Sequence, residues 1–302
     1  MIHIACNIDH QFIQHCAVTL VSLFINNPGQ VFCVHIVAGS LPQEDQDLLT
    51  KLAAPYGHTV RFYFPPADLL KNYSIKMATY YRCMFPSILP ETVDKVLYLD
   101  CDIVIRGDIS AFWNTDLEGY GVACIEDIGS QEKERYELLH YDPADSYFNA
   151  GVLLINLRYW RGTHVDRQCE TYFLTYPERI RFNDQDLLNV VLHAHKKFVP
   201  LTWNMQDGFY RTGIRERVND WKAFREKLLN PVILHYTNKK PWNYDRMHPL
   251  RAEYFVYLDK TPWKGWRPSH SVKTRIKRFF KLLPYALKWR KPKYINLDKA
   301  VG

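Results

Sequence analysis

The stretch KVLYLDCDI, residues 95–103, joins an apolar, β-prone run to a pair of acids. Residues 95–99 have the composition of a buried strand. Asp100 and Asp102 follow one residue apart, and side chains two positions apart in an extended chain point the same way. Two adjacent carboxylates repel each other unless a cation lies between them. We therefore interpret this Asp-x-Asp pair as ligands of a divalent ion that also binds a diphosphate. The alternative is an exposed pair of acids in a turn.

Strand and helix patterns alternate along the chain on both sides of this stretch. The predicted strands are residues 2–6, 31–37, 59–64, 95–99, 151–157 and a run that ends at residue 235. The predicted helices of the first half are residues 15–24 and 42–54. This alternation predicts an α/β fold with a partly parallel sheet flanked by helices. Ligands bind beyond the carboxyl ends of the strands in such sheets, so the residues that follow each strand are the candidate site.

His235 and Lys240 stand at and after the end of one of these strands, in VILHYTNKKPW, residues 232–242. The imidazole could complete a metal site, and a nitrogen ligand beside carboxylates favours Mn²⁺ over Mg²⁺. Lys240 could meet a phosphate as a point charge. The alternative for His235 is a structural histidine at a strand end.

Two further polar stretches have a functional and a structural interpretation. Phe148-Asn149-Ala150-Gly151 precedes a strand. Its small residues allow backbone to approach a ligand, or it is simply a turn. Asn183-Asp184-Gln185 opens a helical run. We expect Asn183 or Asp184 to cap that helix, and Asp184 and Gln185 are candidates to hold an oxygen-rich ligand at the helix N-terminus.

The composition is that of an ordinary soluble protein: 302 residues, 47% apolar and 24% charged. This excludes a disordered or fibrous chain. The seven cysteines are odd in number and include no Cys-x-x-Cys pair, so we expect reduced thiols in the cytosol rather than a disulfide or zinc framework. No signal-peptide pattern and no run of about 18 apolar residues is present, so we expect neither secretion nor a membrane-spanning helix.

The C-terminal segment differs in charge from the rest of the chain. Residues 261–302 contain twelve lysines and arginines and one acid, Asp298. The segment therefore carries +11, and because the whole chain carries +7, the preceding part carries −4. Apolar residues recur at helical spacing from Val272 to Leu283, and we expect Pro284 to end this helix. We interpret residues 259–302 as a basic amphipathic tail that binds an anionic membrane surface. The alternatives are non-specific nucleic-acid binding and a helix packed on the body.

Six stretches, taken in order, resemble the retaining glycosyltransferases of family 8, and most closely the bacterial lipopolysaccharide or lipooligosaccharide α-galactosyl- and glucosyltransferases. The stretches are IACNID (4–9), TYYR (79–82), KVLYLDCDIVIRGDI (95–109), YFNAGVLLINLRYW (147–160), NDQDLLN (183–189) and HYTNKKPW (235–242). The resemblance covers about residues 1–250. It implies a GT-A fold, a Rossmann-like mixed sheet flanked by helices that binds a nucleotide sugar, as a catalytic domain over residues 1–258.

The resemblance also implies roles for individual residues. Asp100, Asp102 and His235 would bind Mn²⁺, with Mg²⁺ as the alternative, and this ion would hold the diphosphate of a UDP-sugar. The residues implied to contact uridine are Ala5, Asn7 and Asp9, where the family often has an acid in place of Asn7. Those implied near the diphosphate and the donor sugar are Arg82, Asn149, Ala150 and Lys240. The family commonly has HxxGxxKPW where this chain has a loop one residue shorter with Asn238, so Lys239 competes with Lys240 for the phosphate, and we favour Lys240.

The function implied is retaining transfer of galactose or glucose from a UDP-sugar to a lipid-anchored oligosaccharide, at the inner face of the cytoplasmic membrane. Asp184 and Gln185 match residues beside the anomeric carbon of the transferred sugar. An amide is a feeble nucleophile, so we expect attack by the acceptor hydroxyl on the face that UDP leaves, with Gln185 as electrostatic support. A covalent route through Asp184 is the rival. The alternative functions are a UDP-sugar-binding protein without turnover and a nucleic-acid-binding protein, of which we expect the latter least.

Overall fold

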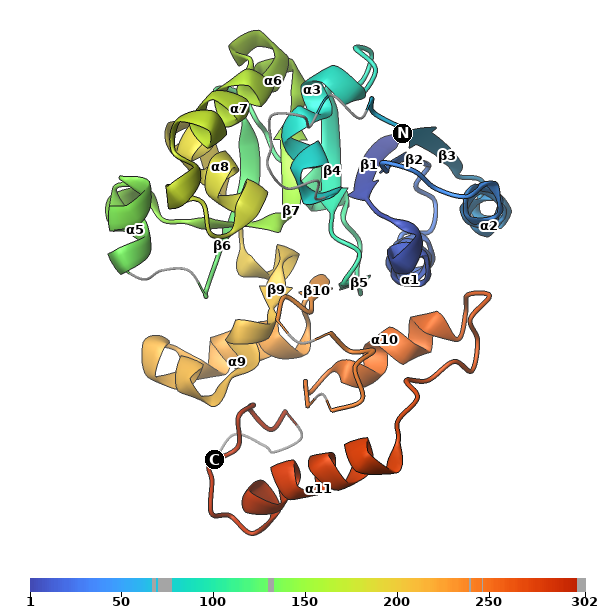
Figure 1. Ribbon diagram of the computed structural model, residues 1–302, viewed down its shortest axis with the longest axis vertical. Helices are drawn as coiled ribbons and strands as arrows, with labels where there is room; N and C mark the ends of the chain where they lie inside the picture. Colours follow the sequence, from blue (N-terminus) through green and yellow to red (C-terminus); the bar gives the residue numbers. More distant parts are fainter. Residues whose placement is uncertain (67–68, 70–77, 130–132, 239, 246, 298–302) are drawn as a thin grey trace.

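A seven-stranded sheet with the order β3-β2-β1-β4-β7-β6-β8 forms the upper part of the molecule (Figure 1). The structure, a computed structural model, describes residues 1–297 except 67–68, 70–77, 130–132, 239 and 246. Within these residues the strands are β1 Ile2–Asn7, β2 Phe32–Val37, β3 Thr59–Tyr63, β4 Lys95–Leu99, β6 Val122–Glu126, β7 Phe148–Asn156 and β8 Lys196–Phe198. The predicted strands of the first half are confirmed, and β7 begins earlier than expected, so residues 148–150 belong to a strand and not to a turn.

The sheet is mixed, as the α/β prediction requires. β1 is parallel to β2 and β4, and β2 is parallel to β3, whereas β7 runs antiparallel to both β4 and β6. Ala5 of β1 lies beside Tyr98 of β4. Extending this register by two residues brings the end of β1, Asn7, beside Asp100. The carboxyl edge of the parallel strands therefore gathers the two stretches that the sequence singled out.

Two hydrophobic layers cover the two faces of the sheet. Strand β4 shows the reason, because its side chains alternate: Leu97 and Leu99 join one layer, and Val96 and Tyr98 join the other. The first layer is formed with helices α1 Ile13–Asn26 and α2 Gln43–Ala53. The second is formed with α3 Phe85–Ile88, α6 Leu157–Thr163, α7 Val165–Thr175 and α8 Asn183–Leu192 (Figure 1). Two short helices, α4 Ser110–Trp113 and α5 Lys133–Leu139, lie in the connections.

A second, three-stranded sheet has the order β5-β10-β9, with β5 Ile103–Ile105, β9 Met205–Gln206 and β10 Ile233–His235. β10 is antiparallel to β5, and His235 is the pairing partner of Ile103. The backbone N–H of Tyr236 donates to the carbonyl oxygen of Asp102 at 3.0 Å. This small sheet therefore carries the end of β10 to the acids that follow β4.

Three helices form the lower part of the molecule: α9 Trp221–Leu229, α10 Arg251–Leu258 and α11 Val272–Ala286 (Figure 1). The expectation that Pro284 ends the last helix is wrong, because α11 continues two residues beyond it. No residue of α11 is buried, so the carbonyl group that loses its donor at the proline can bind water. After α11 the chain turns back, and Tyr294 forms an antiparallel bridge with Arg211. The end of the predicted tail thus packs on the body.

Candidate functional site

Asp100, Asp102 and His235 converge at the junction of the two sheets, with ligand atoms that all lie within 4.8 Å of one another. Nε2 of His235 is 3.2 Å from Oδ1 of Asp102 and 3.8 Å from Oδ2 of Asp100. His235 and Asp102 are buried. Two carboxylates and one imidazole are a donor set that suits a divalent cation such as Mn²⁺. The structure therefore brings together the three residues that the sequence proposed as ligands.

A chain of hydrogen bonds behind His235 sets the orientation of its ring. The N–H of Gly151 donates to Oδ1 of Asn149 at 3.0 Å, and Nδ2 of Asn204 donates to the same oxygen at 2.9 Å. Oδ1 of Asn204 then accepts from Nδ1 of His235 at 2.8 Å. In the neutral imidazole this leaves the lone pair of Nε2 facing two carboxylates, an arrangement that a cation would stabilise.

Position 151 has no space for a side chain, so it requires glycine. A β-carbon built on this residue would lie 2.2 Å from Cε1 of His235 and 2.6 Å from Oδ2 of Asp100. The backbone of β7 thus forms one wall of the cluster. The sequence suggested that the lack of a side chain at Gly151 lets a ligand approach the backbone. In the structure it lets the side chains of His235 and Asp100 approach instead.

Lys240 contacts the same cluster. Its Nζ donates to Oδ2 of Asp102 and, at 3.1 Å, to the carbonyl oxygen of Tyr236. Burial alone would raise the pKa of the Asp102 carboxyl, but Lys240 and His235 hold it well below its ordinary range. Asp102 is therefore a carboxylate at any working pH. Lys239, the rival lysine, lies outside the described residues.

Arg82 ties two site carboxylates together beneath the cavity. Its Nη2 donates to Oδ1 of Asp100 at 2.9 Å, Nε lies 2.9 Å from Oδ2 of Asp184, and Nη1 donates to the carbonyl oxygen of Ala150. The guanidinium is 4% exposed and lies over the ring of Tyr98. Burial alone would lower the pKa of Arg82, but the two carboxylates raise it above its ordinary value. Because Arg82 is buried and already contacts Asp100 and Asp184, we interpret it as a residue that positions these two acids.

Asp184 is a buried acid with a perturbed pKa. Burial raises the pKa of its carboxyl to about 6, and Asp100 adds to the rise although Arg82 opposes it. Its Oδ2 atom is 2.9 Å from Nε of Arg82, but the geometry does not make this contact a directed hydrogen bond. A buried carboxyl with a raised pKa beside a cavity is typical of a functional site.

The expectation that Asn183 or Asp184 caps α8 is wrong. The residue before the helix is Phe182, which makes no side-chain cap. Instead the carboxylate of Asp186 accepts the N–H groups of Arg181, at 2.7 Å, and Phe182, at 2.6 Å. Asp186 thereby holds the chain in place before the helix, and Asn183 adopts a left-handed conformation with φ 49°. Backbone strain of this kind clusters at functional sites.

Gln185 is held at both ends of its amide. Oε1 accepts from the N–H of Ala150 at 2.9 Å and from Nδ2 of Asn149 at 3.3 Å, and Nε2 donates to Oδ2 of Asp127 at 3.1 Å. Asp127 also accepts from Asn149 and from the N–H of Gly129. The site residues proposed from the sequence did not include Asp127. The signal for Asp127 in the sequence is its place beside the apolar run of residues 121–125, most of which forms β6.

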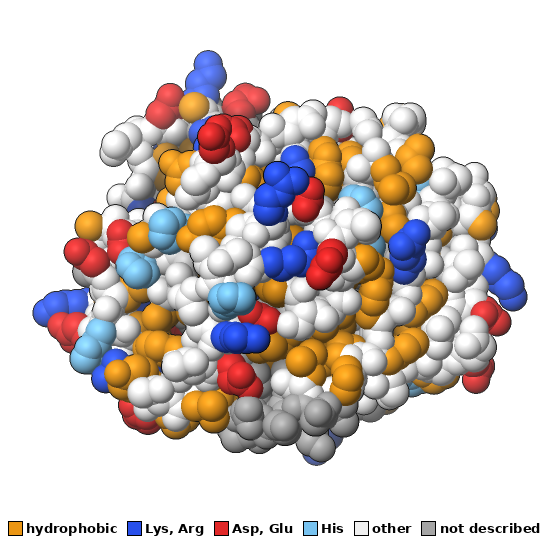
Figure 2. All heavy atoms as spheres, turned by 90° about the horizontal axis from the view of Figure 1, so that it is seen from above, with side chains coloured by type: hydrophobic (Ala, Val, Ile, Leu, Met, Phe, Trp, Pro, Cys, Tyr) orange, Lys and Arg blue, Asp and Glu red, His pale blue; other side chains and the backbone are white. Residues whose placement is uncertain are grey.

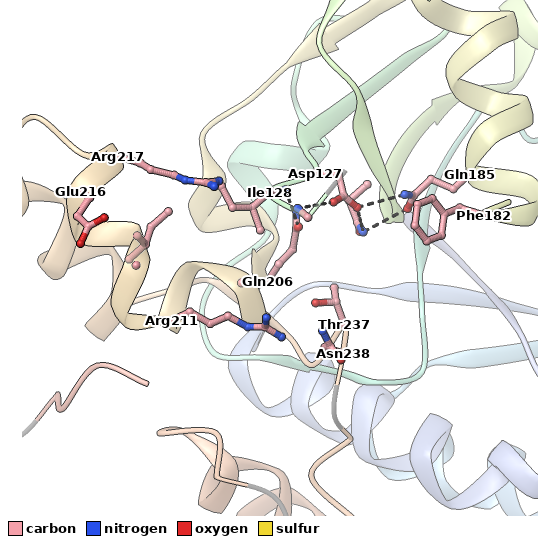
Figure 3. A pocket seen from close by; sticks show the side chains of 15 residues that line it. Asp127, Ile128, Phe182, Gln185, Gln206, Arg211, Glu216, Arg217, Thr237 and Asn238 are labelled. Atoms are coloured by element: carbon pink, nitrogen blue, oxygen red, sulfur yellow. Dashed lines mark hydrogen bonds between the residues drawn. The ribbon is translucent and has the colours of Figure 1, made fainter. Parts of the chain in front are cut away.

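Two cavities meet at Gln185. The smaller, about 230 Å³, is lined by nine of the proposed residues: Arg82, Asp100, Asp102, Asn149, Ala150, Asp184, Gln185, His235 and Lys240. The larger, about 750 Å³, shares Asn149, Phe182, Gln185 and Thr237 with it. Figure 3 shows Asp127, Phe182 and Gln185 on one side of the larger cavity and Arg211, Glu216 and Arg217 on the other.

Ala5, Asn7 and Asp9 line neither cavity. Ala5 is fully buried within the sheet, and Asp9 is exposed and accepts from the N–H of Phe12 at 3.1 Å. Asn7 is different, because both atoms of its amide are buried and neither has a hydrogen-bond partner among the described residues. A buried amide without a partner is costly, so this group is a candidate to bind a ligand.

Comparisons with known proteins agree with one another. The sequence profile of "Glycosyl transferase family 8" matches residues 3–246. A lipopolysaccharide 1,2-glucosyltransferase of Escherichia coli is 28% identical over 285 residues, which cover 90% of this chain and 82% of that protein. A lipopolysaccharide 1,3-galactosyltransferase of Salmonella typhimurium is 27% identical, with 92% and 85% covered. The crystal structure of the galactosyltransferase LgtC with donor and acceptor sugar analogs is similar in fold, with a TM-score of 0.77, 21% identity, and 91% of this chain and 100% of that chain covered.

In the part of the chain that the structure describes, every helix is too short or too polar to cross a bilayer.

Proposed function

The chain belongs to glycosyl transferase family 8, and from this premise we propose that it is a retaining, Mn²⁺-dependent hexosyltransferase. It moves galactose or glucose from a UDP-sugar to a glycan of the lipopolysaccharide or lipooligosaccharide type. The observation that supports this most is the convergence of Asp100, Asp102 and His235 on the cavity that Gln185 also lines. A single donor bound in this cavity would then contact both the metal site and Gln185.

The diphosphate of the donor would bind beside Asp100, Asp102 and His235. The donor set fits a divalent cation, and the imidazole nitrogen favours Mn²⁺ over Mg²⁺. When bound, this ion supplies positive charge to the leaving diphosphate. Lys240 supplies a second positive charge, and it already contacts Asp102 at the edge of the same cavity. Its flexible stem lets it exchange that carboxylate for a phosphate oxygen.

The uridine would lie at the end of β1. The register between β1 and β4 brings Asn7 beside Asp100, so a nucleoside at Asn7 is next to the diphosphate site. The unpaired amide of Asn7 can donate to and accept from uracil, which presents both kinds of group. The exposed Asp9 completes this proposed subsite, and Ala5 lies behind it within the sheet.

The sugar would lie where the two cavities meet. Asn149 and Ala150 line the smaller cavity, and Gln185 lines both. The acceptor hydroxyl attacks C1 on the face that UDP leaves, its proton passes to the leaving phosphate oxygen, and the C1 configuration is retained. The carbonyl oxygen of Gln185, oriented by Asp127, supports the positive charge that develops on the sugar. Covalent attack by Asp184 is disfavoured because this carboxylate is tied to Arg82.

The larger cavity is the proposed acceptor site. Its volume of about 750 Å³ is within the range of small-molecule sites. Both polar and apolar groups line it, including Arg211 and Phe182 (Figure 3). The relatives named for lipopolysaccharide glucosyl and galactosyl transfer support an acceptor of this class.

Residues 259–302 are proposed to attach the enzyme to the inner face of the cytoplasmic membrane. On α11 the side chains of Val272, Phe279 and Phe280 are 70%, 60% and 64% exposed, and Trp289 beyond it is 75% exposed. Basic residues surround them, as in helices that lie on anionic membranes. At the opposite end of the molecule, acidic and basic side chains are interspersed (Figure 2). The α11 end, by contrast, combines exposed aromatic groups with excess positive charge.

The test is a panel of UDP-sugars, each incubated with and without Mn²⁺, in the presence and absence of lactose-type acceptors. The proposal expects Mn²⁺-dependent release of UDP from UDP-galactose or UDP-glucose, and a glycoside product whose anomeric configuration matches the donor. Mn²⁺-dependent UDP-sugar binding without UDP release would instead establish the alternative, a binding protein without turnover. Release that is equal with and without Mn²⁺ would refute the metal assignment.

A further inference from the structure

A third cavity, of about 710 Å³, lies between α11 and the body. One wall is the exposed edge of the body at Arg211 and Gly213, and the other is formed by Lys281 of α11 and the turn that follows it, with Arg290, Lys291 and Lys293. The membrane role proposed for residues 259–302 rests on the exposed side chains of α11 and Trp289, and it assigns nothing to the space between α11 and the body.

The lining of this cavity is strongly basic. Arg211 pairs with Asp207 at 3.2 Å, and Lys281 pairs with Asp245. Asp245 is the only acid in the lining, within the residues that the structure describes. Among the described residues, no carboxylate pairs with Arg290, Lys291 or Lys293. Three uncompensated cations around one cavity attract a multiply charged anion.

The basic turn is fixed to the body and is not a loose tail. The N–H of Thr212 donates to the carbonyl oxygen of Lys293 at 3.2 Å, and its hydroxyl donates to the carbonyl oxygen of Pro292 at 3.0 Å. The N–H of Ile295 donates to Tyr210 at 2.9 Å, and the hydroxyl of Tyr294 donates to Asp207 at 2.8 Å. The cations are therefore held in front of the body before any ligand binds, which reduces the entropic cost of binding one.

Arg211 and Gly213 line this basic cavity and also the larger cavity that ends at Gln185. The two spaces therefore adjoin at the same two residues. A glycan with its reacting hydroxyl at Gln185 would have to extend past Arg211 to carry a charged substituent into the basic cavity. Figure 3 shows the side chain of Arg211 projecting into the larger cavity, on the side of Thr237 and Asn238.

We propose that the basic cavity binds a phosphate group carried by the acceptor, so that the preferred acceptor is a phosphorylated oligosaccharide. A phosphomonoester has nearly two negative charges and three acceptor oxygens, which match several unpaired cations better than a single carboxylate does. The inference rests on the proposed function, because it assigns the larger cavity to the acceptor. A lipid headgroup also carries a phosphate group. The glycan is the favoured source, because the basic cavity and the acceptor cavity share Arg211 and Gly213. The exposed aromatic residues Phe279 and Phe280 line a separate groove on α11.

The test compares a disaccharide acceptor with the same disaccharide bearing a phosphomonoester, at saturating donor and low salt. The wild-type protein should show a KM about tenfold lower for the phosphorylated acceptor, and the gap should narrow as salt increases. The triple variant Arg290→Gln/Lys291→Gln/Lys293→Gln should lose this preference. Its kcat and KM for the neutral acceptor and its rate of UDP-sugar hydrolysis should be unchanged.

The matched control is Lys264→Gln/Lys273→Gln/Lys277→Gln, which removes the same charge from exposed positions outside both cavities. It should keep the preference. Equal KM values in the wild-type protein, a preference that survives in the first variant, or equal losses in both variants would each overturn the proposal.

Two further measurements separate the sources of failure. If no UDP-sugar is hydrolysed or transferred, the proposed function fails, and isothermal titration with the two disaccharides decides the basic cavity by itself. Tighter binding of the phosphorylated disaccharide, lost in the first variant only, would uphold the role of the basic cavity, and equal binding would reject it.

Vesicles of phosphatidylglycerol test whether the phosphate comes from a lipid. Loss of vesicle binding in the first variant alone, with the acceptor preference intact, would assign the cavity to a headgroup and overturn the proposal.

Discussion

The backbone of Gly151 is in direct contact with the imidazole of His235, because a β-carbon on residue 151 would lie 2.2 Å from its Cε1 atom. The contact links the central sheet to the small sheet at the point where the candidate metal ligands meet. It also means that one methyl group, placed outside the ligand set, can disrupt that set.

Gly151→Ala should therefore reduce transfer by at least about a hundredfold, because a displacement of about 1 Å at a catalytic centre costs that much. His235 and Asp100 both have to move, so the affinity for Mn²⁺ should fall in parallel, measured by titration of activity with the metal. Gly162→Ala is the control, since a β-carbon there meets nothing within 4 Å. Wild-type activity in Gly151→Ala would show that the three side chains need not meet as they do here.

Asp102→Ala should abolish both transfer and the metal-dependent part of UDP binding. The carboxylate is buried and lies 3.2 Å from Nε2 of His235, and without it Asp100 is the one carboxylate left in the proposed ligand set. Removal of metal from the wild-type protein with a chelator should have the same effect, and added Mn²⁺ should restore activity in the wild-type protein alone. The exposed Asp108→Ala variant serves as the control. If Asp102→Ala retained normal turnover, the metal assignment would be wrong.

Gln185→Ala should lower kcat by about a hundredfold or more while the KM for the donor changes little. The amide is proposed to act on the charge that develops at C1 and not on the bound ground state. Asp127→Asn should show a weaker form of the same pattern. It replaces one of two carboxylate oxygens, which accept from Gln185 and from Gly129, by an N–H₂ donor, and so it weakens the orientation of the Gln185 amide. A large rise in donor KM alone would make Gln185 a binding residue. A glycosyl-enzyme on Asp184, found by mass spectrometry, would replace same-face attack with the covalent route.

The free energy of unfolding should fall as the pH drops from about 6.5 toward 4. Burial lowers the pKa of His248 to about 4, although Asp207 opposes this, and burial lowers the pKa of His15 and His35 in the same way. In this window the unfolded chain binds a proton at each histidine and the native chain does not, so protonation favours unfolding by at most about 1.4 kcal/mol per pH unit for each. Urea unfolding at several pH values measures it. His248→Asn should reduce the slope, and the exposed His140→Asn should not.

Phe279→Ser/Phe280→Ser should weaken binding to anionic vesicles by more than about tenfold. Both rings are exposed on α11, and burying an aromatic side chain contributes about 1.5–3 kcal/mol. Co-sedimentation with vesicles measures the loss, and transfer to a water-soluble acceptor should be unaffected. Leu174→Ser, an equally exposed apolar side chain on α7, is the control. Unchanged vesicle binding in the double variant would leave α11 without a membrane role.

Local patterns in the sequence predicted the strands of the parallel half of the sheet and the pair of acids at the end of β4. The period of two places Val96 and Tyr98 on one face and Leu97 and Leu99 on the other, and it depends only on neighbouring residues. The same logic failed at α8 and at Pro284. At α8 the carboxylate of Asp186, within the first turn of the helix, accepts from the preceding backbone in place of a cap by Asn183 or Asp184. At Pro284 the helix is exposed and continues.

By itself, the sequence predicted which side chains are candidates to carry the chemistry, because each stands at the end of a recognisable element. Only the tertiary structure decided which of them meet. Strand β10 had to pair with β5 before His235 could face Asp102, and β6 had to enter the central sheet before Asp127 could orient Gln185. The basic cavity is a still stronger case, since it requires Arg211, Lys281 and the turn at residues 290–293 to lie together. Periodicity reports what one element does with its neighbours in the chain, whereas contacts between distant segments depend on strand register and packing that no local pattern encodes.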